Sequence, residues 1–361
     1  MYMNKKKDVP AGKFDQRFKN IPSKLWMQIT RIDELKGQWN AETKLSPYTL
    51  GKLKHSVLVT STGSSTRIEG AQLSDEEIEK LLRGLSIQKL ADRDQQEVQG
   101  YFELLENIFE AWDRIQFNES TIKHFHKELL KYVEKDKRHL GEYKKKENQV
   151  HAIDGQGNLV GIVFDTTPAY RTPIEMQSLV SWTKDALQNG EFHPLIVIAN
   201  FIVEFLAIHP FEDGNGRMSR ILTNLLLLRA GYAYVPYVSH EKMIEDNKKD
   251  YYLALCQSQK SFKSENGTIV PWLQFFLNIM HRQTKIAIDL LGKENVEHLF
   301  SPKQLAAWKY LHSVSEATPK DIARETNTAR PTVNQILTKF LKLGKIEKLG
   351  LGRSTRYRIR K

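Results

Sequence analysis

The chain has 361 residues, of which 40% are hydrophobic and 10% aromatic, so it is long enough and apolar enough for two or three packed domains. Its single cysteine, Cys256, excludes a disulfide framework and a cysteine-based zinc site within one chain. The formal net charge of +11 is concentrated in residues 301–361, which contain 14 Lys or Arg and 4 Asp or Glu, whereas the first 300 residues are close to neutral.

The first third of the chain is predicted to be helical. Residues 1–44 are expected to form a basic arm followed by a short helix, and they lack the apolar segment of a signal peptide. Apolar spacing predicts helices between about 45 and 115, one of them at about 56–70, and Ser74 and Glu77 form a capping box before the next one. Further amphipathic helices are predicted at 97–115 and 120–133.

One β signal interrupts the helices. Residues 148–154 and 159–166 flank the Gly-rich turn 155–158 and are predicted to form a β-hairpin. The longest apolar run, 195–208, has 14 residues and includes Glu204, which indicates a buried helix and not a membrane span. We therefore expect a soluble, cytoplasmic protein with no membrane partner. Helices are predicted at 174–188, 194–208, 216–230, 241–258 and 270–290.

Residues 209–220, HPFEDGNGRMSR, connect two of these helices and concentrate polar side chains. Pro210 ends the first helix, and residues 214–216 lead into the second, whose free N–H groups and positive dipole end favour an anion. Arg217 and Arg220 lie about one turn apart and can each bind phosphate oxygens. The turn therefore predicts a phosphate site.

Two further side chains of this turn suit chemistry on a bound nucleotide. Asp213 offers the hard oxygen ligand that phosphate-bound Mg²⁺ prefers, and His209 is the nearby group able to accept a proton at neutral pH. One alternative is a capped helix hairpin with an exposed histidine. Another is a metal hydrolase, although the turn lacks a second histidine at ligand spacing.

The twelve residues resemble the signature of the Fic (Fic/DOC) family, HPFx[D/E]GNGRxxR, and match it at every fixed position. The resemblance implies a helical bundle with a β-hairpin flap, and transfer of AMP from ATP to a Tyr, Thr or Ser hydroxyl of a target protein with release of pyrophosphate. Family members that act as kinases typically have lysine where Gly216 stands, so AMP transfer is favoured. The implied roles are His209 as general base, Asp213 as Mg²⁺ ligand, Gly214, Asn215 and Gly216 as phosphate cradle, Arg217 and Arg220 at the β- and γ-phosphates, and Phe211 as a buried anchor.

Residues 64–70, SSTRIEG, resemble the family's inhibitory motif [S/T]xxxE[G/N], with Ser65, Glu69 and Gly70 at its fixed positions. Ser65 and Glu69 lie on one face of a helix. The resemblance implies that Glu69 pairs with Arg220 and occupies the space of the γ-phosphate, since a carboxylate and a phosphate cannot both bind that arginine. An ordinary helix end at Gly70 is the alternative.

The hairpin resembles the family's flap, which pairs with an extended segment of the target protein. Residues 141–144 resemble the family's Gly-x-aromatic-Arg, with Lys144 in place of the arginine. A hairpin that only shields the core, and tyrosines that only pack in the core, are alternatives. The residues assigned by resemblance are Ile162, Val163, Phe164 and Asp165 in the flap, nearest the nucleotide, and Tyr251 and Tyr252 beside the adenine and ribose, with at most one tyrosine expected to contact the base.

Residues 301–361 are predicted to form helix, helix, turn, helix and a β-hairpin after the mainly helical domain at 45–295. This order resembles a winged helix-turn-helix, in which the helix near 331–343 enters a major groove and the basic wing contacts phosphates. The excess positive charge agrees with that interpretation, while docking to protein or dimerisation is the alternative. The candidate DNA contacts are Arg330, Thr332, Asn334, Lys339, Arg353 and Arg356.

The leading hypothesis is an autoinhibited protein adenylyltransferase that uses ATP and Mg²⁺, modifies a protein docked on the flap and contacts double-stranded DNA through its C-terminal domain. A homodimer is compatible with this class. The alternative is a DNA-binding regulator whose Fic-like core senses nucleotide without turnover. His209 separates the two, because a sensor needs the phosphate loop but has no use for a general base.

Overall fold

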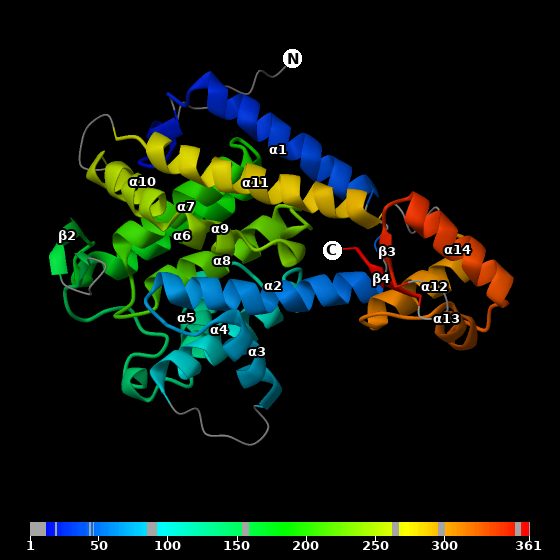
Figure 1. The fold of residues 1–361 in the computed structure, drawn as a ribbon. Helices are drawn as coiled ribbons and strands as arrows, with labels where there is room; N and C mark the ends of the chain where they lie inside the picture. The colour runs from blue at the N-terminus through cyan, green and yellow to red at the C-terminus, as the bar shows by residue number, and fades with distance from the viewer. Residues whose placement is uncertain are drawn as a thin grey trace, which may run out of the picture. The chain divides into compact units, whose positions relative to one another are not determined.

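The computed structural model describes residues 12–18, 20–42, 45, 47–84, 92–153, 159–261, 267–294, 300–350 and 355–360. Within these residues the fold is mainly helical, with two small antiparallel sheets (Figure 1). The chain divides into two compact parts, Met1–Ile288 and Asp289–Lys361, here called unit 1 and unit 2. Over the described ranges, no helix is both long enough and apolar enough to cross a membrane.

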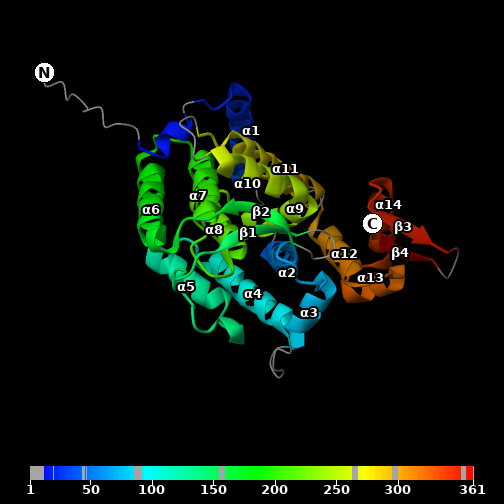
Figure 2. The same cartoon turned by 90° about the vertical axis from the view of Figure 1, so that its left-hand side faces the viewer.

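Helix α7, Pro194–Ile208, forms the centre of unit 1. Nearly all of its residues are buried, because a helix that is apolar on every side is stable only in an interior. Its one acidic residue, Glu204, is 4% exposed and accepts a hydrogen bond of 2.7 Å from the guanidinium of Arg17. The neighbouring α6, Thr172–Asn189, and α8, Asn215–Arg229, pack against it (Figure 2).

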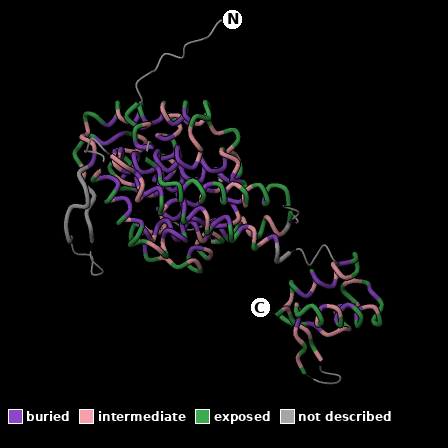
Figure 3. Tube along the Cα trace, turned by 90° about the horizontal axis from the view of Figure 1, so that it is seen from above, coloured by how far each residue is buried: buried purple, intermediate pink, exposed green. Residues whose placement is uncertain are grey.

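A second group of helices surrounds α2, Pro47–Ile68. Helix α2 packs against α4, Arg93–Ala111, and α9, His240–Asp246. The expected capping box precedes α3, Asp75–Gly84: the Ser74 N–H donates to Glu77 Oε2 at 2.8 Å, and the Glu77 N–H donates to Ser74 Oγ at 3.3 Å. Helix α5, Glu119–Leu129, packs on α4 and is capped by the Asn118 side chain. Buried residues run through the middle of unit 1 (Figure 3).

The N-terminal helix is longer than the sequence suggested. Helix α1, Ser23–Glu42, has 20 residues, and its buried side chains recur at helical spacing. Trp39 is 2% exposed, and its ring lies 5.7 Å from that of Tyr237. Gln28 donates a hydrogen bond of 2.8 Å to Asn278 of α11, Val270–Glu294. Helix α1 therefore packs one apolar face against the interior of unit 1.

The single helix expected at 241–258 is divided in two. Helix α9 ends at Asp246, and α10 runs from Lys248 to Ser261. At the break, the Asn247 side chain donates a hydrogen bond of 2.7 Å to the Met243 carbonyl. An amide side chain that donates to a backbone carbonyl four residues earlier competes with the backbone hydrogen bonds that would continue the helix. This competition accounts for the interruption.

The predicted hairpin is present. Strand β1, Gln149–Ile153, pairs antiparallel with β2, Leu159–Asp165, and the register shifts twice along the pair. Residues 154–158 lie outside the described residues, and only the backbone is described for 149–153 and 159–165. Short 3₁₀ helices occur at Asp15–Phe18, Glu134–Asp136, Ala169–Arg171 and Val235–Tyr237.

After the end of α11, the described residues of unit 2 form three helices and a hairpin around their own apolar core. Helix α12 spans Pro302–Ser313, α13 spans Pro319–Glu325 and α14 spans Arg330–Lys342. Strand β3, Ile346–Leu349, pairs antiparallel with β4, Arg356–Ile359. One face of α14 supplies much of the core through Val333, Ile336, Leu337 and Phe340.

Candidate active site

The turn between α7 and α8 carries the candidate site. His209 ends α7 in the left-handed region with φ of 54°, a conformation that non-glycine residues adopt at an energetic cost. Gly214, with φ of 77°, leads into α8, so the start of α8 lies within the turn. The first N–H groups of a helix have no acceptor within the helix, and this turn can therefore offer them to an anion.

The turn is held closed by Phe211 and Asn215. Phe211 is fully buried, and its ring stacks on that of His126 at 3.9 Å. The Phe211 N–H donates to Asn215 Oδ1 at 2.9 Å, while Asn215 Nδ2 donates to the Phe211 carbonyl at 2.8 Å. The Asn215 amide thus braces the loop, and contact with a phosphate would be left to the backbone of this segment.

His126 supports the turn from α5, and sequence reasoning had not singled it out. The Gly141 N–H donates to His126 Nδ1 at 3.0 Å, so Nδ1 carries no proton and Nε2 can donate to the Asp213 carbonyl at 3.1 Å. Burial lowers the pKa of His126 to about 4, which keeps the ring neutral. The one signal in the sequence is its place on the apolar face of a predicted helix.

His209 has the protonation state that a general base needs. Its Nδ1 lies 3.3 Å from the Leu206 carbonyl, and a carbonyl can only accept, so Nδ1 carries the proton and Nε2 keeps its lone pair. Burial, assisted by the positive charge of Lys144, lowers the pKa of His209 to about 4. The imidazole is therefore neutral at physiological pH.

Asp213 lies among guanidinium groups. Its Oδ2 is 2.9 Å from Arg217 and 2.7 Å from Arg93 of α4. Burial would raise the pKa of Asp213, but Arg217, the Gly214 N–H and Arg93 hold it below its usual value. A carboxylate that stays ionised in this way fits the single protein ligand that phosphate-bound Mg²⁺ commonly uses. No cluster of three or more acidic, His or Cys side chains able to hold a metal occurs in the described part of the chain.

Arg217 points into the protein. It is 2% exposed and pairs with Glu97 of α4 at 2.6 Å as well as with Asp213. The resemblance assigns this arginine to the phosphates, and in the structure its side chain pairs with two carboxylates. Arg93 and Glu97 carry no local motif, so their part in the site becomes visible only when α4 is packed on α8.

Glu69 and Arg220, which are 151 positions apart, meet at the start of α8. Arg220 Nη2 donates to Glu69 Oε1 at 2.7 Å, and its Nε donates to Ser65 Oγ, also at 2.7 Å. A Cβ atom built on Gly216 would overlap the Glu69 carboxylate, so this carboxylate lies directly against the first turn of α8. Gly70 follows with φ of 111° and ends the segment.

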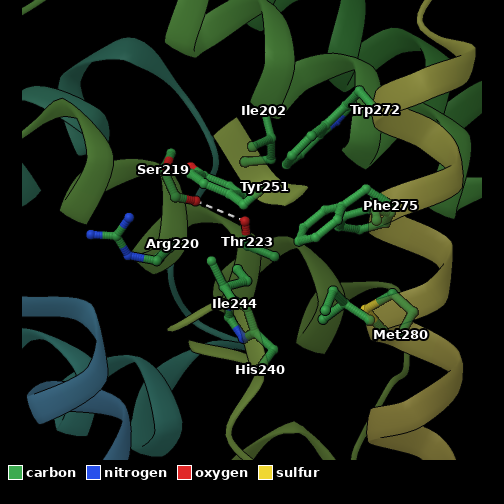
Figure 4. A pocket seen from close by; sticks show the side chains of 12 residues that line it. Ile202, Ser219, Arg220, Thr223, His240, Ile244, Tyr251, Trp272, Phe275 and Met280 are labelled. Carbon is green, nitrogen blue, oxygen red and sulfur yellow. Dashed lines mark hydrogen bonds between the residues drawn. The ribbon is translucent and has the colours of Figure 1, made fainter. Parts of the chain in front are cut away.

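The two tyrosines have different surroundings. Tyr251 is 3% exposed and packs 5.8 Å from the rings of Trp272 and Phe275. With Arg220 it lines a small cavity of about 20 Å³, which is room for about one water and not for a base (Figure 4). Tyr252 is half-buried, and burial and the charge of Glu69 raise its pKa. Of the pair, Tyr252 is therefore the side chain accessible to a ligand beside Glu69.

The flap residues Ile162, Val163, Phe164 and Asp165 all lie in β2, where the structure describes the backbone but not the side chains. Near the ends of this hairpin, Lys144 is 3% exposed and donates to the Ile208 carbonyl at 3.1 Å. The flap is thus tied at its base to the residue before His209.

Comparison with known proteins agrees with this architecture. Residues 116–227, which include the whole turn, match the model of the Fic/DOC family. The chain is 35% identical over 109 residues to the protein adenylyltransferase Fic of Aedes aegypti, covering 30% of this chain and 19% of that protein. It is 25% identical over 156 residues to a probable protein adenylyltransferase of Aquifex aeolicus, covering 41% and 48%. The chain thus matches less than half of the length of these curated relatives.

Solved structures extend the similarity beyond the matched segment. A Fic family protein from Desulfovibrio desulfuricans G20 superposes with a TM-score of 0.64 at 23% identity, covering 94% of this chain and 97% of that one. A Fic domain containing signalling protein from Bacteroides thetaiotaomicron superposes with a TM-score of 0.59 at 25% identity, covering 73% and 97%. Residues 116–227 therefore match the Fic/DOC family model, and the fold of the chain is similar to those of solved Fic proteins.

Proposed function

We propose that unit 1 is a protein adenylyltransferase that transfers AMP from ATP to a hydroxyl group of a target protein, and that Glu69 restrains it. One observation carries the proposal: the Glu69 carboxylate bonds to Arg220 and lies against Gly216 at the start of α8. A carboxylate in this position supports an anion site, because helix N–H groups and a guanidinium converge there. We infer that the transferred group is AMP from the names of the two curated relatives, a protein adenylyltransferase and a probable protein adenylyltransferase.

The proposed reaction moves one proton and one nucleotidyl group. His209 Nε2 accepts the proton of the target hydroxyl, whose oxygen then forms a bond to the α-phosphorus of ATP. The bond from that phosphorus to the oxygen bridging the β-phosphate breaks, pyrophosphate leaves, and AMP remains on the target. Asp213 would hold Mg²⁺, which supplies positive charge to the phosphates when it is bound.

Glu69 blocks this reaction in the proposal by competing for Arg220. When the carboxylate holds the guanidinium, a γ-phosphate cannot take the same position, and the α-phosphate is not brought in line with the hydroxyl. Ser65 also binds Arg220, through both its hydroxyl and its carbonyl, so the arginine keeps its place when Glu69 is removed. Glu69 can therefore be tested without dismantling the site.

The test compares full-length wild type with Glu69→Gly, Glu69→Gln and the double variant Glu69→Gly/His209→Ala, using ATP labelled at the α-phosphate. We expect Glu69→Gly to raise label transfer to protein by about 10- to 150-fold, the factor equivalent to a charge-assisted hydrogen bond of about 1.5–3 kcal/mol. Glu69→Gln, which keeps the bulk and loses the charge, should lie between. The double variant should transfer nothing. Equal transfer by wild type and Glu69→Gly would remove the restraint from the proposal.

We propose a second function, duplex DNA binding, for unit 2. The observation that favours it is the exposed face of α14, opposite its apolar one, which presents Arg330, Asn334 and Gln335. A helix that follows a short turn and presents such side chains suits a major groove. Thr332 is half-buried on the same helix. If His209→Ala has no effect on any activity while DNA binding responds to ATP, the nucleotide-sensing regulator is the better account.

The other candidate DNA contacts differ in whether their side chains already bind other residues of unit 2. Lys339 donates to Gln304 of α12 at 3.0 Å and is turned toward its own unit, which makes it a weak candidate. Arg356 is exposed on β4 and pairs with Glu316 at 2.7 Å. Arg353 lies outside the described residues. Arg330 is therefore the side chain with which to test DNA binding.

The test titrates the full chain with duplex DNA at several salt concentrations. The logarithm of the binding constant should fall linearly with the logarithm of the salt concentration. Arg330→Ala should reduce the slope of this line by about one unit if the arginine contacts a phosphate. Arg31→Ala, an exposed arginine of α1 in unit 1, is the matched control and should leave the slope unchanged. Binding that is absent, or insensitive to salt, would count against a nucleic-acid role.

A further inference from the structure

Three polar residues, the buried Lys144 and Thr166 and the half-buried Asn148, join the base of the hairpin to the turn that carries His209. Lys144 is 3% exposed and Thr166 is 9% exposed. Asn148 immediately precedes β1, and Thr166 immediately follows β2, so the two stand at the two ends of the hairpin. These residues are called the hairpin-base cluster below.

Lys144 is the centre of the cluster. Its ammonium donates to Asn148 Oδ1 at 2.7 Å, to Thr166 Oγ1 at 2.8 Å and to the Ile208 carbonyl at 3.1 Å. Three oxygen acceptors use all three N–H donors of the ammonium, whereas a neutral amine has only two. The Thr166 hydroxyl in turn donates to Asn148. The charged lysine therefore binds both ends of the hairpin and the last residue of α7 together.

Lys144 and Asn148 together donate hydrogen bonds to four consecutive backbone carbonyls, those of residues 208–211. Besides the Ile208 carbonyl, the Lys144 backbone N–H donates to the Pro210 carbonyl at 2.8 Å. Asn148 Nδ2 donates to the Phe211 carbonyl at 3.0 Å and to the His209 carbonyl at 3.4 Å. These hydrogen bonds to successive carbonyls fix the backbone on both sides of His209. They hold it in the left-handed conformation, which a non-glycine residue rarely adopts by itself.

We infer that Lys144 is a positioning residue for the transfer reaction: through the hairpin-base cluster it holds His209 and the flap in one fixed relation. The importance of this arrangement for the reaction rests on the proposed function. A target segment paired with the flap delivers its hydroxyl from one side, and His209 accepts the proton from the other. Because Lys144 binds both, the separation between hydroxyl and base depends on its ammonium.

The charge of Lys144 is sensitive to alkaline conditions. Burial lowers the pKa of Lys144 to about 8, against the opposing effect of Glu147, which lies in the segment between Lys144 and β1. The titratable group facing it from α7 is His209, which is neutral in this range, and Thr166 beyond β2 does not titrate. Above about pH 8 the amine loses one donor, so one of the three bonds must break.

The experiment introduces Lys144→Met and Lys144→Arg into the Glu69→Gly form, with Lys145→Met as the control at an exposed neighbouring lysine. We expect Lys144→Met to lower the transfer rate at saturating ATP by about 100-fold, the effect of a misplacement on the order of 1 Å. Affinity for a nonhydrolysable ATP analogue should be unchanged, since the phosphate side of the turn is not touched. Transfer should fall above about pH 8 with Lys144 and not with Lys144→Arg, which keeps its charge.

Amide hydrogen exchange gives a readout that does not require activity. In Lys144→Met, exchange should accelerate at 149–153, 159–165 and 209–211 and stay unchanged within α7, whereas Lys145→Met should match the parent. If Lys144→Met fails to fold, Thr166→Val removes one acceptor at nearly equal volume and should show the same pattern more weakly.

The outcomes separate the two proposals. A Glu69→Gly form that transfers no AMP rejects the proposed function, and the exchange pattern then decides the positioning role alone. Full transfer by Lys144→Met, a parallel loss of analogue binding, or unchanged exchange in the hairpin and turn would each overturn that role.

Discussion

At the scale of single residues, the site depends on charges that are fixed by burial and by partners. Asp213 stays ionised because two guanidinium groups face it, and His209 stays neutral because it is buried next to a cation. Both groups are thus deprotonated at neutral pH, one as a charged carboxylate and the other as a neutral imidazole. A metal ligand and a general base both need this deprotonated form.

The lowered pKa of His209 predicts that the rate of AMP transfer changes little as the pH falls below neutrality. The base acts when neutral, so its activity is present above its pKa and is lost as pH falls through about 4. We expect transfer by the Glu69→Gly form, measured as kcat/KM, to change little between pH 6 and pH 8. A histidine with the ordinary pKa of about 6.5 would instead lose activity about tenfold for each unit below that value. An acid limb centred near 6.5 would contradict the assigned environment.

At the scale of elements, the C-terminal part of α2 is anchored by contacts other than the one that Glu69 makes. Ser61 donates to Ser239 at 2.8 Å, and Arg67 pairs with Glu245 of α9 at 2.6 Å. Because these contacts hold the helix in place, release of Arg220 requires only the Glu69 side chain to turn away. The restraint is therefore expected to be a local switch and not an undocking of α2.

The close approach of α4 and α5 gives a prediction about stability. A Cβ on Gly100 of α4 would overlap the Leu129 carbonyl at the end of α5. Alanine usually stabilises a helix by about 1 kcal/mol relative to glycine, but overpacking here should destabilise the protein by about 1–3 kcal/mol. Denaturant unfolding of Gly100→Ala measures it, with Gly51→Ala in α2, which meets no neighbouring atom, as control. A stabilised Gly100→Ala would show that the helices do not approach so closely.

At the scale of the whole molecule, local patterns in the sequence predicted the elements, while contacts between distant segments did not follow from it. The apolar run of α7 and the hairpin around 155–158 are visible as composition and alternation. The length of α1 was not, because it depends on what the helix packs against, and the break at Asn247 follows from a local hydrogen bond to Met243 that the apolar spacing does not show. Tertiary contacts override such local signals.

The candidate site shows the same division. The residues of the turn were predicted as a set because their spacing is local. The partners of that turn, Arg93, Glu97 and His126, come from α4 and α5 and have no spacing relation to it. Lys144 was noted as a departure from a pattern, but its bonds to both ends of the hairpin required the folded chain.

The central claim is that the turn binds ATP with its α-phosphate toward His209. It is tested most directly by incubating the Glu69→Gly form and target protein with ATP labelled either at the α- or at the γ-phosphate. The account predicts that α-label becomes bound to protein, while γ-label is released as pyrophosphate. Protein that retains γ-label instead would mean that the nucleotide binds in the opposite direction and that the protein transfers a phosphate, which would contradict the account.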